Sequence, residues 1–332
     1  MTALSLVRAH GLAVRALVAA GATVENAEAV ARALVAAEAD GLAGHGLSRV
    51  PAYADQAVAG KVDGRASPTL RQTAPAVLVV DAADGFAFPA IALGLAQARI
   101  LVRDTGVCAL AVTNSHHFGA AGYHVEPLAA DGLAALVFGN SPAGIAPWGG
   151  RRAIFGTNPI AFACPRRGAP PLVIDLSLSK VARGKIMVAA QKGEAIPEGW
   201  ALDAEGRPTT DAKAALAGTM LPMGDAKGYA LVLMAEILAA ALTGARFGYE
   251  ASSFFDAKGP PPRVGQFFLI FDPIRFVGHG FAQRVAELAN AILAQPGARL
   301  PGERRLKLRA KAAVDGLVIP DALYDELVRR AG

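Results

Sequence analysis

Short apolar runs that alternate with helical segments restrict the fold of this chain more strongly than any other feature of its sequence. Five runs in its middle have the length, apolar content and flanking turn residues of β-strands: 76–85, 107–115, 133–141, 158–165 and 171–177. Residues 88–105 and 119–130 lie between them and have helical spacing. Because such alternation is typical of α/β proteins, we predict that class.

Helices are predicted at the start of the chain. Residues 4–39 are rich in alanine with a break near Gly21, and Thr23 suits an N-cap. Ser48 is a second candidate N-cap, for a helix with Pro51 in its first turn.

Further elements are predicted after residue 225. Residues 228–243 are apolar on nearly all faces, which predicts a central buried helix. Residues 267–273 have the composition of a strand, 281–294 form an amphipathic helical pattern, and 306–331 suggest two short helices split at 316–320.

Composition limits the class of protein. The chain has 332 residues, of which 53 % are apolar and 18 % charged, and this suits a globular unit with a substantial core. The apolar stretch 229–243 contains Glu236 and is shorter than the roughly 20 residues that span a bilayer. The N-terminus lacks the features of a signal peptide, and Cys108 and Cys164 suggest no disulfide framework. We predict a cytoplasmic protein with no membrane partner.

The net charge is +5, and basic residues gather late in the chain, at Arg304, Arg305, Lys307, Arg309 and Lys311. One interpretation is a nucleic-acid patch, and the other is a solvated basic face or a field that attracts small anions. No zinc-finger or aromatic RNA-binding motif accompanies the cluster. The second interpretation is therefore favoured, and no nucleic-acid partner is predicted.

Nucleotide-binding fingerprints are absent. No G-x-G-x-x-G follows any predicted strand, and no G-x-x-x-x-G-K-[ST] occurs. A nucleotide would therefore have to bind in another way.

The segment GHGLSRVPAY places His45 between two glycines and Arg49 four residues later. A single histidine is more often structural than catalytic. A guanidinium at a helix N-terminus, however, can hold a carboxylate by two hydrogen bonds, and a neighbouring imidazole can then transfer a proton to the adjacent oxygen.

The segment NSHHFGAAGYH contains His116 and His117 between a predicted strand and a predicted helix. Adjacent strand residues face opposite ways and no carboxylate or cysteine is near, so no metal site is predicted. One histidine facing a cleft, with the other structural, explains the pair more simply.

Two further segments carry candidate cofactor residues. Asp175 ends a predicted strand, where it would bind ribose hydroxyls or cap a helix, and Lys180 would meet a 2′-phosphate. Lys227 opens the long apolar helix, where it either pairs with a bound anion such as a pyrophosphate or extends into solvent.

Taken together, six segments of this sequence resemble the type-2 malate/L-lactate dehydrogenase family in order and spacing. They are DGLAGHGLSRVPAY (40–53), NSHHFGAAGYH (114–124), APWGGRRAIFGTNPIAFACP (146–165), VIDLSLSKVARGK (173–185), AKGYALVLMAEILAAALTGARFG (226–248) and LPGE (300–303). The resemblance covers nearly the whole chain. It implies a non-Rossmann, sulfolactate-dehydrogenase-like α/β fold with a mixed sheet, flanking helices and a helical N-terminal region, usually as a homodimer.

The resemblance also implies roles for particular residues. It makes His45 and His117 catalytic, and Arg49 and Tyr53 substrate-binding. The implied contacts with NADP or NAD are Ser141, Asp175, Leu176, Ser177, Lys227, Pro301, Gly302 and Glu303. Two positions depart from many members of the family. Gly44 stands where imine-reducing members have a serine assigned to a proton relay, and Ala226 stands where many members have histidine before the lysine.

The resulting hypothesis is a NAD(P)-dependent oxidoreductase that transfers a hydride between nicotinamide and C2 of a small 2-hydroxy or 2-oxo acid of malate, lactate or sulfolactate type. A cyclic imine reductase and a non-catalytic binder of anionic metabolites are the alternatives. Arg151 and Arg152 would contact a second anionic group or stand on the surface, and Lys180 favours NADP. We expect one catalytic unit over 1–332, with a substrate and dimerisation part (about 1–75 and 245–332) and a cofactor-binding part (about 76–244).

Overall fold

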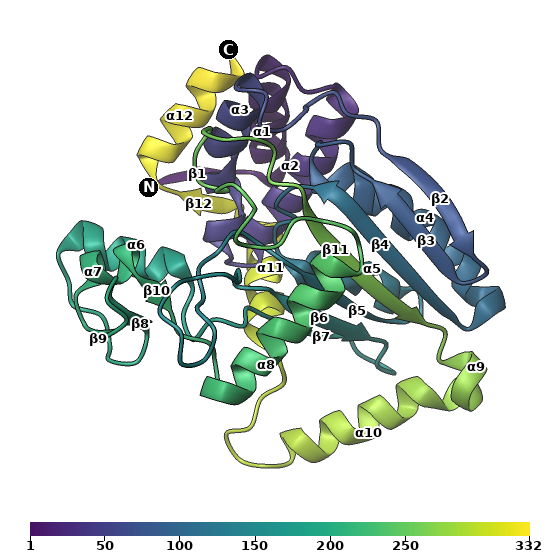
Figure 1. Cartoon of the computed structure of the whole chain (residues 1–332). Coiled ribbons are helices and arrows are strands. Elements are labelled where there is room, and N and C mark those ends of the chain that lie inside the picture. The colour runs from purple at the N-terminus through teal and green to yellow at the C-terminus, as the bar shows by residue number, and fades with distance from the viewer.

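A computed structural model describes all 332 residues. Its centre is a seven-stranded sheet with the strand order β2-β3-β4-β11-β5-β6-β7 (Figure 1). The strands are β2 (Thr69–Ala74), β3 (Val77–Asp81), β4 (Val107–Ser115), β11 (Val264–Phe271), β5 (Ala134–Gly139), β6 (Ile160–Cys164) and β7 (Leu172–Leu176). The α/β class and the five predicted central strands are confirmed.

The sheet is mixed, and this determines where functional residues gather. Only β3 and β4 pair in parallel, and every other neighbouring pair is antiparallel. It follows that β3, β4, β5 and β7 all run in one direction and end at the same edge. In open α/β sheets ligands bind at the carboxyl ends of such strands.

Helices α4 (Ala87–Thr105) and α5 (Ala121–Ala130) cover one face of the sheet. Side chains alternate along β11, so Phe268 and Ile270 join the core beneath these two helices while Phe267 points to the opposite face. Helix α4 ends at Gly106, whose left-handed φ of +76° suits glycine.

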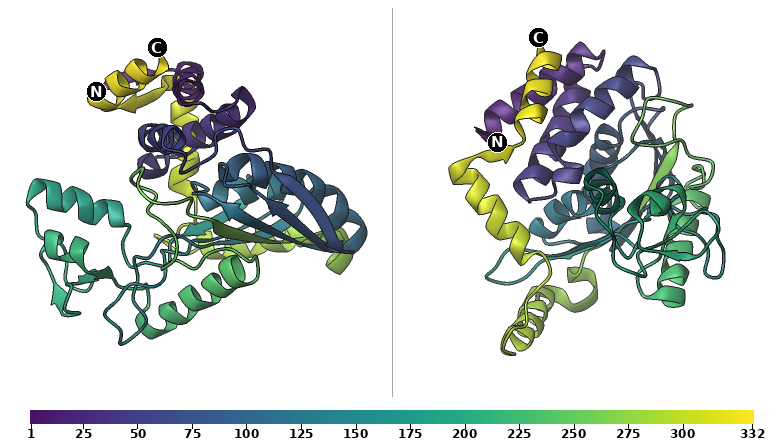
Figure 2. Two further views of the ribbon diagram at one scale, coloured as in Figure 1. Left: turned by 45° about the horizontal axis from the view of Figure 1, so that its top comes forward. Right: turned by 90° about the vertical axis from the view of Figure 1, so that its left-hand side faces the viewer.

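Helix α8 (Asp225–Glu236), continued by a π-helical turn (Ile237–Ala241), packs on the other face of the sheet and forms an outer layer there (Figure 2, left). The prediction of a central buried helix is therefore wrong. Val232, Ala235 and Ala239 face the core, but the apolar residues on the far side of the helix remain exposed. An all-round apolar sequence predicts burial only if something covers both sides.

A helical layer from both ends of the chain lies beside the sheet (Figure 2). It contains α1 (Leu6–Ala19), α2 (Val24–Ala39), α3 (Val50–Val58), α11 (Glu303–Asp315) and α12 (Asp321–Ala331). The short strands β1 (Thr2–Leu4) and β12 (Leu317–Ile319) pair within it and were not predicted.

Helix caps were predicted with mixed success. The Thr23 hydroxyl accepts a hydrogen bond from the Asn26 N–H, as predicted (3.2 Å). Ser48 is not an N-cap, because it lies in a 3₁₀ turn (Leu47–Arg49) and donates to the Ala43 carbonyl (2.6 Å). Helix α3 starts at Val50, with Arg49 as its N-cap residue and Pro51 in its first turn.

The remaining elements lie at the periphery. Helices α6 (Arg183–Lys192) and α7 (Ala212–Ala217) accompany a small sheet of β8 (Ala201–Leu202), β9 (Pro208–Thr209) and β10 (Thr219–Met220). Helices α9 (Ile274–Val277) and α10 (Phe281–Leu293) extend from the end of β11 (Figure 1). None of the helices has the length and apolar character to cross a membrane.

Candidate active site

Two predicted catalytic histidines meet where the end of β4 faces the turn before α3. The His45 and His117 rings stack with centroids 5.5 Å apart and an interplanar angle of 26°. His45 closes a 3₁₀ turn (Ala43–His45), and His117 is the second residue after β4. The predicted pair is therefore brought together from segments about seventy residues apart.

Tyr53 lies behind His117 and is fully buried. Its hydroxyl lies 2.5 Å from Nδ1 of His117. Because burial raises the pKa of Tyr53, the phenol keeps its proton and donates a hydrogen bond to this nitrogen. Neutral His117 must then carry its own proton on Nε2, which has no partner within the protein.

His116 is held in a different way. Its Nε2 lies 2.6 Å from Oε1 of Gln56, whose amide nitrogen donates to the Phe254 carbonyl (3.0 Å). The Gln56 oxygen is therefore the acceptor and His116 the donor. His116 is only 1 % exposed, so of the two adjacent histidines it is the structural one.

Arg49 is oriented by the protein but carries no ion pair. Its Nε donates to the Gly44 carbonyl (2.7 Å), and its guanidinium lies 4.6 Å from the centre of the Phe255 ring. Arg49 forms no ion pair with a carboxylate, and its side chain contacts only the Gly44 carbonyl and the Phe255 ring, so its terminal nitrogens remain available to an anionic ligand.

The histidines of the site are neutral at pH 7. Burial, followed by the charge of Arg49, lowers the pKa of His45 to about 4. Burial also lowers the pKa of His116 to about 3, and the positive charges of Lys61 and Arg49 contribute to this decrease. Burial likewise places the pKa of His117 well below its usual value. A neutral imidazole at residue 45 can accept a proton from a hydroxyl group.

The structure adds residues to the site that were not predicted. Phe254 packs against His117 and His116, with ring centroids 5.1 and 5.4 Å apart, and Gln56 and Phe255 make the contacts described above. One signal in the sequence pointed to Gln56: with Arg49 and Tyr53 it shares the helical spacing of one face of α3. No comparable signal marks the two phenylalanines.

One group of predicted cofactor residues converges at the ends of β5 and β7. The Ser141 hydroxyl accepts from the Thr157 N–H (3.1 Å), and the Thr157 carbonyl accepts from Leu178, the residue after Ser177. The Leu178 carbonyl then accepts from Met223, just before α8, where Lys227 is exposed and forms no ion pair. Four segments that are separate in the sequence are thus joined by hydrogen bonds at this edge.

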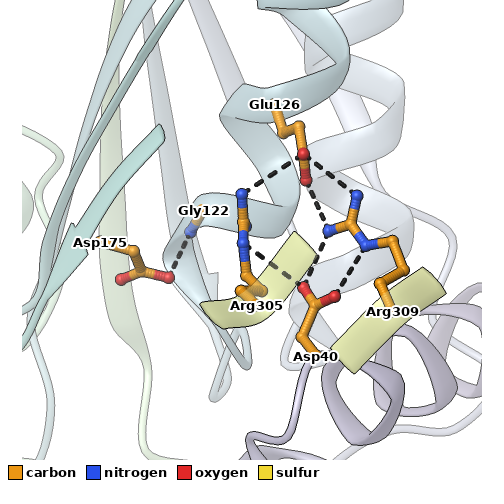
Figure 3. Close-up of polar contacts among 6 residues, drawn as sticks. All are labelled: Asp40, Gly122, Glu126, Asp175, Arg305 and Arg309. Atoms are coloured by element: carbon orange, nitrogen blue, oxygen red, sulfur yellow. Dashed lines mark hydrogen bonds and ion pairs between the residues drawn. The ribbon is translucent and has the colours of Figure 1, made fainter. Parts of the chain in front are cut away.

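A second group lies at the N-terminus of α5. Asp175 accepts a hydrogen bond from the Gly122 N–H through Oδ2 (2.7 Å), so it caps α5 and keeps its other oxygen free (Figure 3). Leu176 ends the same strand. Gly302 lies beside β7, where an added Cβ would come 3.3 Å from the Val173 carbonyl, and Pro301 and Glu303 flank it at the start of α11.

Two arginines of the late basic cluster are held in ion pairs. Arg309 donates to both Asp40 oxygens (2.7 and 2.8 Å) and to Glu126 (2.8 Å), and Arg305 lies between this pair and Asp175 (Figure 3). The solvated-face interpretation does not hold for Arg305 and Arg309, because both side chains form ion pairs with Asp40, at the end of α2, and with Glu126 of α5. No group of histidine, cysteine and carboxylate side chains in the structure has the arrangement of a metal site.

Comparison with known proteins gives one consistent result. The sequence model of the malate/L-lactate dehydrogenase family matches residues 4–328. A (2R)-3-sulfolactate dehydrogenase (NADP(+)) of Chromohalobacter salexigens is 55 % identical over 98 % of this chain and 96 % of its own. A delta(1)-pyrroline-2-carboxylate reductase of Burkholderia ambifaria is 40 % identical over 98 % of this chain and 96 % of its own.

A solved structure supports the same assignment. The delta1-piperideine-2-carboxylate reductase of Pseudomonas syringae superposes with a TM-score of 0.95 at 38 % identity, covering 99 % of this chain and all of its own. The sulfolactate-dehydrogenase-like fold expected from the sequence is confirmed. This chain belongs to the malate/L-lactate dehydrogenase family.

Proposed function

We propose that this protein is an NADP-dependent dehydrogenase that interconverts a small 2-hydroxy acid and its 2-oxo acid, with 3-sulfolactate as the first candidate substrate. The observation that carries this proposal is the unpaired guanidinium of Arg49 beside the stacked His45 and His117 rings. The 55 % identity to a sulfolactate dehydrogenase supports the choice of acid and cofactor.

Each active-site residue has a defined task in the proposed reaction. Arg49 holds the substrate carboxylate through its terminal nitrogens. His45, neutral at pH 7, accepts the hydroxyl proton during oxidation and returns it to the oxygen on C2 during reduction. The Nε2–H of His117, fixed by Tyr53, donates a hydrogen bond to the same oxygen. The sequence placed Tyr53 in the substrate pocket, whereas its complete burial favours this indirect role.

The residues at the sheet edge suit a dinucleotide. Asp175 has a free oxygen for a ribose hydroxyl, Gly302 leaves room for close approach, and Lys227 offers an unpaired charge to a phosphate. Ser141, Leu176, Ser177, Pro301 and Glu303 are proposed to complete these contacts. When bound, the nicotinamide accepts or supplies the hydride.

The direct test is a panel of acids assayed by nicotinamide absorbance with NADP⁺ and NAD⁺. We expect the highest kcat/KM with 3-sulfolactate or malate and NADP⁺, and we propose the exposed Arg151 and Arg152 as candidate partners of the second anionic group of such a substrate. Turnover only with lactate would show that the substrate needs no second anionic group. Salt-sensitive binding without turnover of any acid would instead support a non-catalytic binder.

Cyclic imine reduction is the second candidate, supported by the 40 % identity to pyrroline-2-carboxylate reductases. The glycine at position 44 opposes it, because the family resemblance implies a serine at this position in imine-reducing members. An added Cβ at Gly44 meets no atom within 4 Å, so Gly44→Ser is a matched variant. In the same panel, we expect piperideine-2-carboxylate to be a poor substrate of the native protein and a better one of Gly44→Ser.

We also propose a homodimer, acting in the cytoplasm. Leu231, Leu233, Met234, Ile237 and Leu242 are exposed along α8 and its π-helical turn. A cavity of about 170 Å³ opens among Leu233, Ile237, Phe247 and Tyr249. In α10 only Ala289 is buried, while Leu288 and Leu293 are exposed. Apolar surfaces of this extent are typical of subunit interfaces.

The dimer can be tested by light scattering after size exclusion. The native protein is expected at twice the 34.0 kDa of the chain, and Ile237→Glu or Leu288→Glu at the monomer mass, because a buried charge opposes association. Ile100→Glu, at an exposed apolar position of α4, is the control and should remain dimeric. A monomeric native protein would refute the proposal.

The division into two functional parts also stays a proposal. Strand β11 belongs to the predicted substrate and dimerisation part, yet it lies between β4 and β5 of the cofactor-binding part. The two parts therefore share one sheet.

The free, buried Cys108 and Cys164 are compatible with the proposed cytoplasmic location.

A further inference from the structure

Residues 253–258 form a loop that contacts the candidate active site from a distant part of the sequence. Phe254 is 5 % exposed and packs on His116 and His117. The next residue, Phe255, is 48 % exposed and places its ring against the guanidinium of Arg49, 4.6 Å from ring centre to Cζ. One loop therefore contacts both the histidines and the arginine of the site.

A single buried ammonium group holds this loop. The side chain of Lys61 is completely buried, and its Nζ donates to the carbonyls of Ser253 (2.6 Å), Asp256 (2.9 Å) and Lys258 (2.6 Å). These bonds use all three N–H groups of the ammonium, and the Asp256 carboxylate lies 3.7 Å away. Because burial of a charge is costly, the ammonium group is stable here only while these partners stay in place, so Lys61 and the loop depend on each other.

The loop is attached to the element that carries the substrate-binding side chain. Lys61 follows α3 closely, and Gln56 of α3 donates to the Phe254 carbonyl (3.0 Å). Arg49 is the N-cap residue of the same helix. The loop that carries Phe255 and the residue Arg49 are thus both attached to α3. This helix therefore fixes the orientation of the Phe255 ring relative to the Arg49 guanidinium.

These contacts leave the Arg49 guanidinium little freedom. Its Nε is bonded to the Gly44 carbonyl and one face rests on Phe255, so the edge with its two terminal nitrogens is free. An aromatic face attracts a cation, and it also stops the planar group from rotating. An arginine held in its binding orientation loses less entropy when it binds a carboxylate.

We propose that Phe255 is a positioning residue for Arg49, and that Lys61 acts through the loop to keep Phe255 in place. The proposal rests on the proposed role of Arg49 as the carboxylate binder. According to this proposal, Phe255 and Lys61 both contribute to the affinity for the acid substrate. Neither residue is proposed to contact the cofactor.

The test measures steady-state kinetics with 3-sulfolactate and NADP⁺. Phe255→Leu keeps an apolar side chain but removes the aromatic face. We expect the KM for 3-sulfolactate to rise about 3- to 10-fold, in keeping with a partly exposed cation–π contact, with the KM for NADP⁺ unchanged. Phe255→Tyr should retain the native KM. Phe276→Leu, at an exposed phenylalanine of α9, is the matched control and should change neither constant.

Lys61→Met tests the second half of the proposal. It leaves three carbonyls without their donor, so we expect a lower Tm together with a KM for 3-sulfolactate at least as high as in Phe255→Leu. Adding Phe255→Leu to Lys61→Met should raise that KM little further, because both changes disturb the same contact. A full multiplicative effect would show that Lys61 does not act through Phe255.

Arg49→Lys separates failure of this inference from failure of the proposed function. An ammonium cannot reproduce the two-point hydrogen bonding, so the KM for 3-sulfolactate should rise strongly. If that KM rises in Arg49→Lys but not in Phe255→Leu, only the positioning role is refuted. If Arg49→Lys leaves it unchanged, the carboxylate-binding role itself is wrong and the inference falls with it.

Discussion

Replacement of His45 by alanine is expected to lower kcat about 100- to 10 000-fold, the usual contribution of a general acid–base group. In the proposed reaction the imidazole exchanges a proton with the oxygen on C2, and its low pKa leaves it neutral and able to accept one at pH 7. No other titratable side chain stacks on His117 in its place. Stopped-flow single-turnover measurements of NADPH formation would give the rate of the chemical step directly.

The controls for His45→Ala address binding and folding. The Kd for NADPH, measured by fluorescence titration, should stay within about twofold of the native value, because residue 45 makes no proposed cofactor contact. The Tm should also change little, since His45 donates and accepts no side-chain hydrogen bond within the protein. Native turnover in the variant would exclude His45 from the mechanism.

Acid is expected to destabilise the protein steeply between pH 6.5 and 4. Burial lowers the pKa of His116 to about 3 and the pKa values of His45 and His124 to about 4, and the pKa of His117 lies well below 6.5. In the unfolded chain these four side chains bind protons below pH 6.5, whereas in the native protein they remain neutral. Their stabilisation is therefore fully present above pH 6.5 and is lost as the pH falls towards the native values.

The size of this effect follows from proton linkage. Each histidine that is protonated only in the unfolded state costs about 1.4 kcal/mol of unfolding free energy per pH unit, so the four together cost roughly 5.6 kcal/mol per unit at most. Urea unfolding at a series of pH values would measure the slope. His124→Gln should reduce the slope by about one proton, and a stability that is constant from pH 6.5 to 4.5 would show that the histidines do not stay neutral.

The sheet and its large helices could be predicted because their patterns are local. The runs at 107–115 and 133–141 became β4 and β5 almost without change, and the spacing over 88–105 became α4. The layer in which an element lies was harder to predict. The apolar sequence of α8 could not distinguish a helix buried inside one chain from one that presents a surface to a partner.

The residues of the candidate site could likewise be predicted only where they lie in a recognisable local sequence pattern. His45 and His117 were found because each lies in a distinctive short segment, and the structure brings those segments together. The contacts of Lys61 with residues 253–258 join parts of the chain nearly 200 residues apart. A lysine near the end of a helix and two phenylalanines in a loop carry no local pattern that reveals such a contact. Pairings of this kind depend on the tertiary fold.

The position of β11 affects how the chain can fold while it is being synthesised on the ribosome. Residues 264–271 pair with β4 on one side and β5 on the other, so the centre of the sheet stays open until more than three quarters of the chain has been synthesised. Until then β4 and β5 expose unpaired backbone to neighbouring nascent chains. Chaperones that cover apolar strands would therefore be needed most during translation of residues 140–264, and no fragment ending before β11 would contain a finished core.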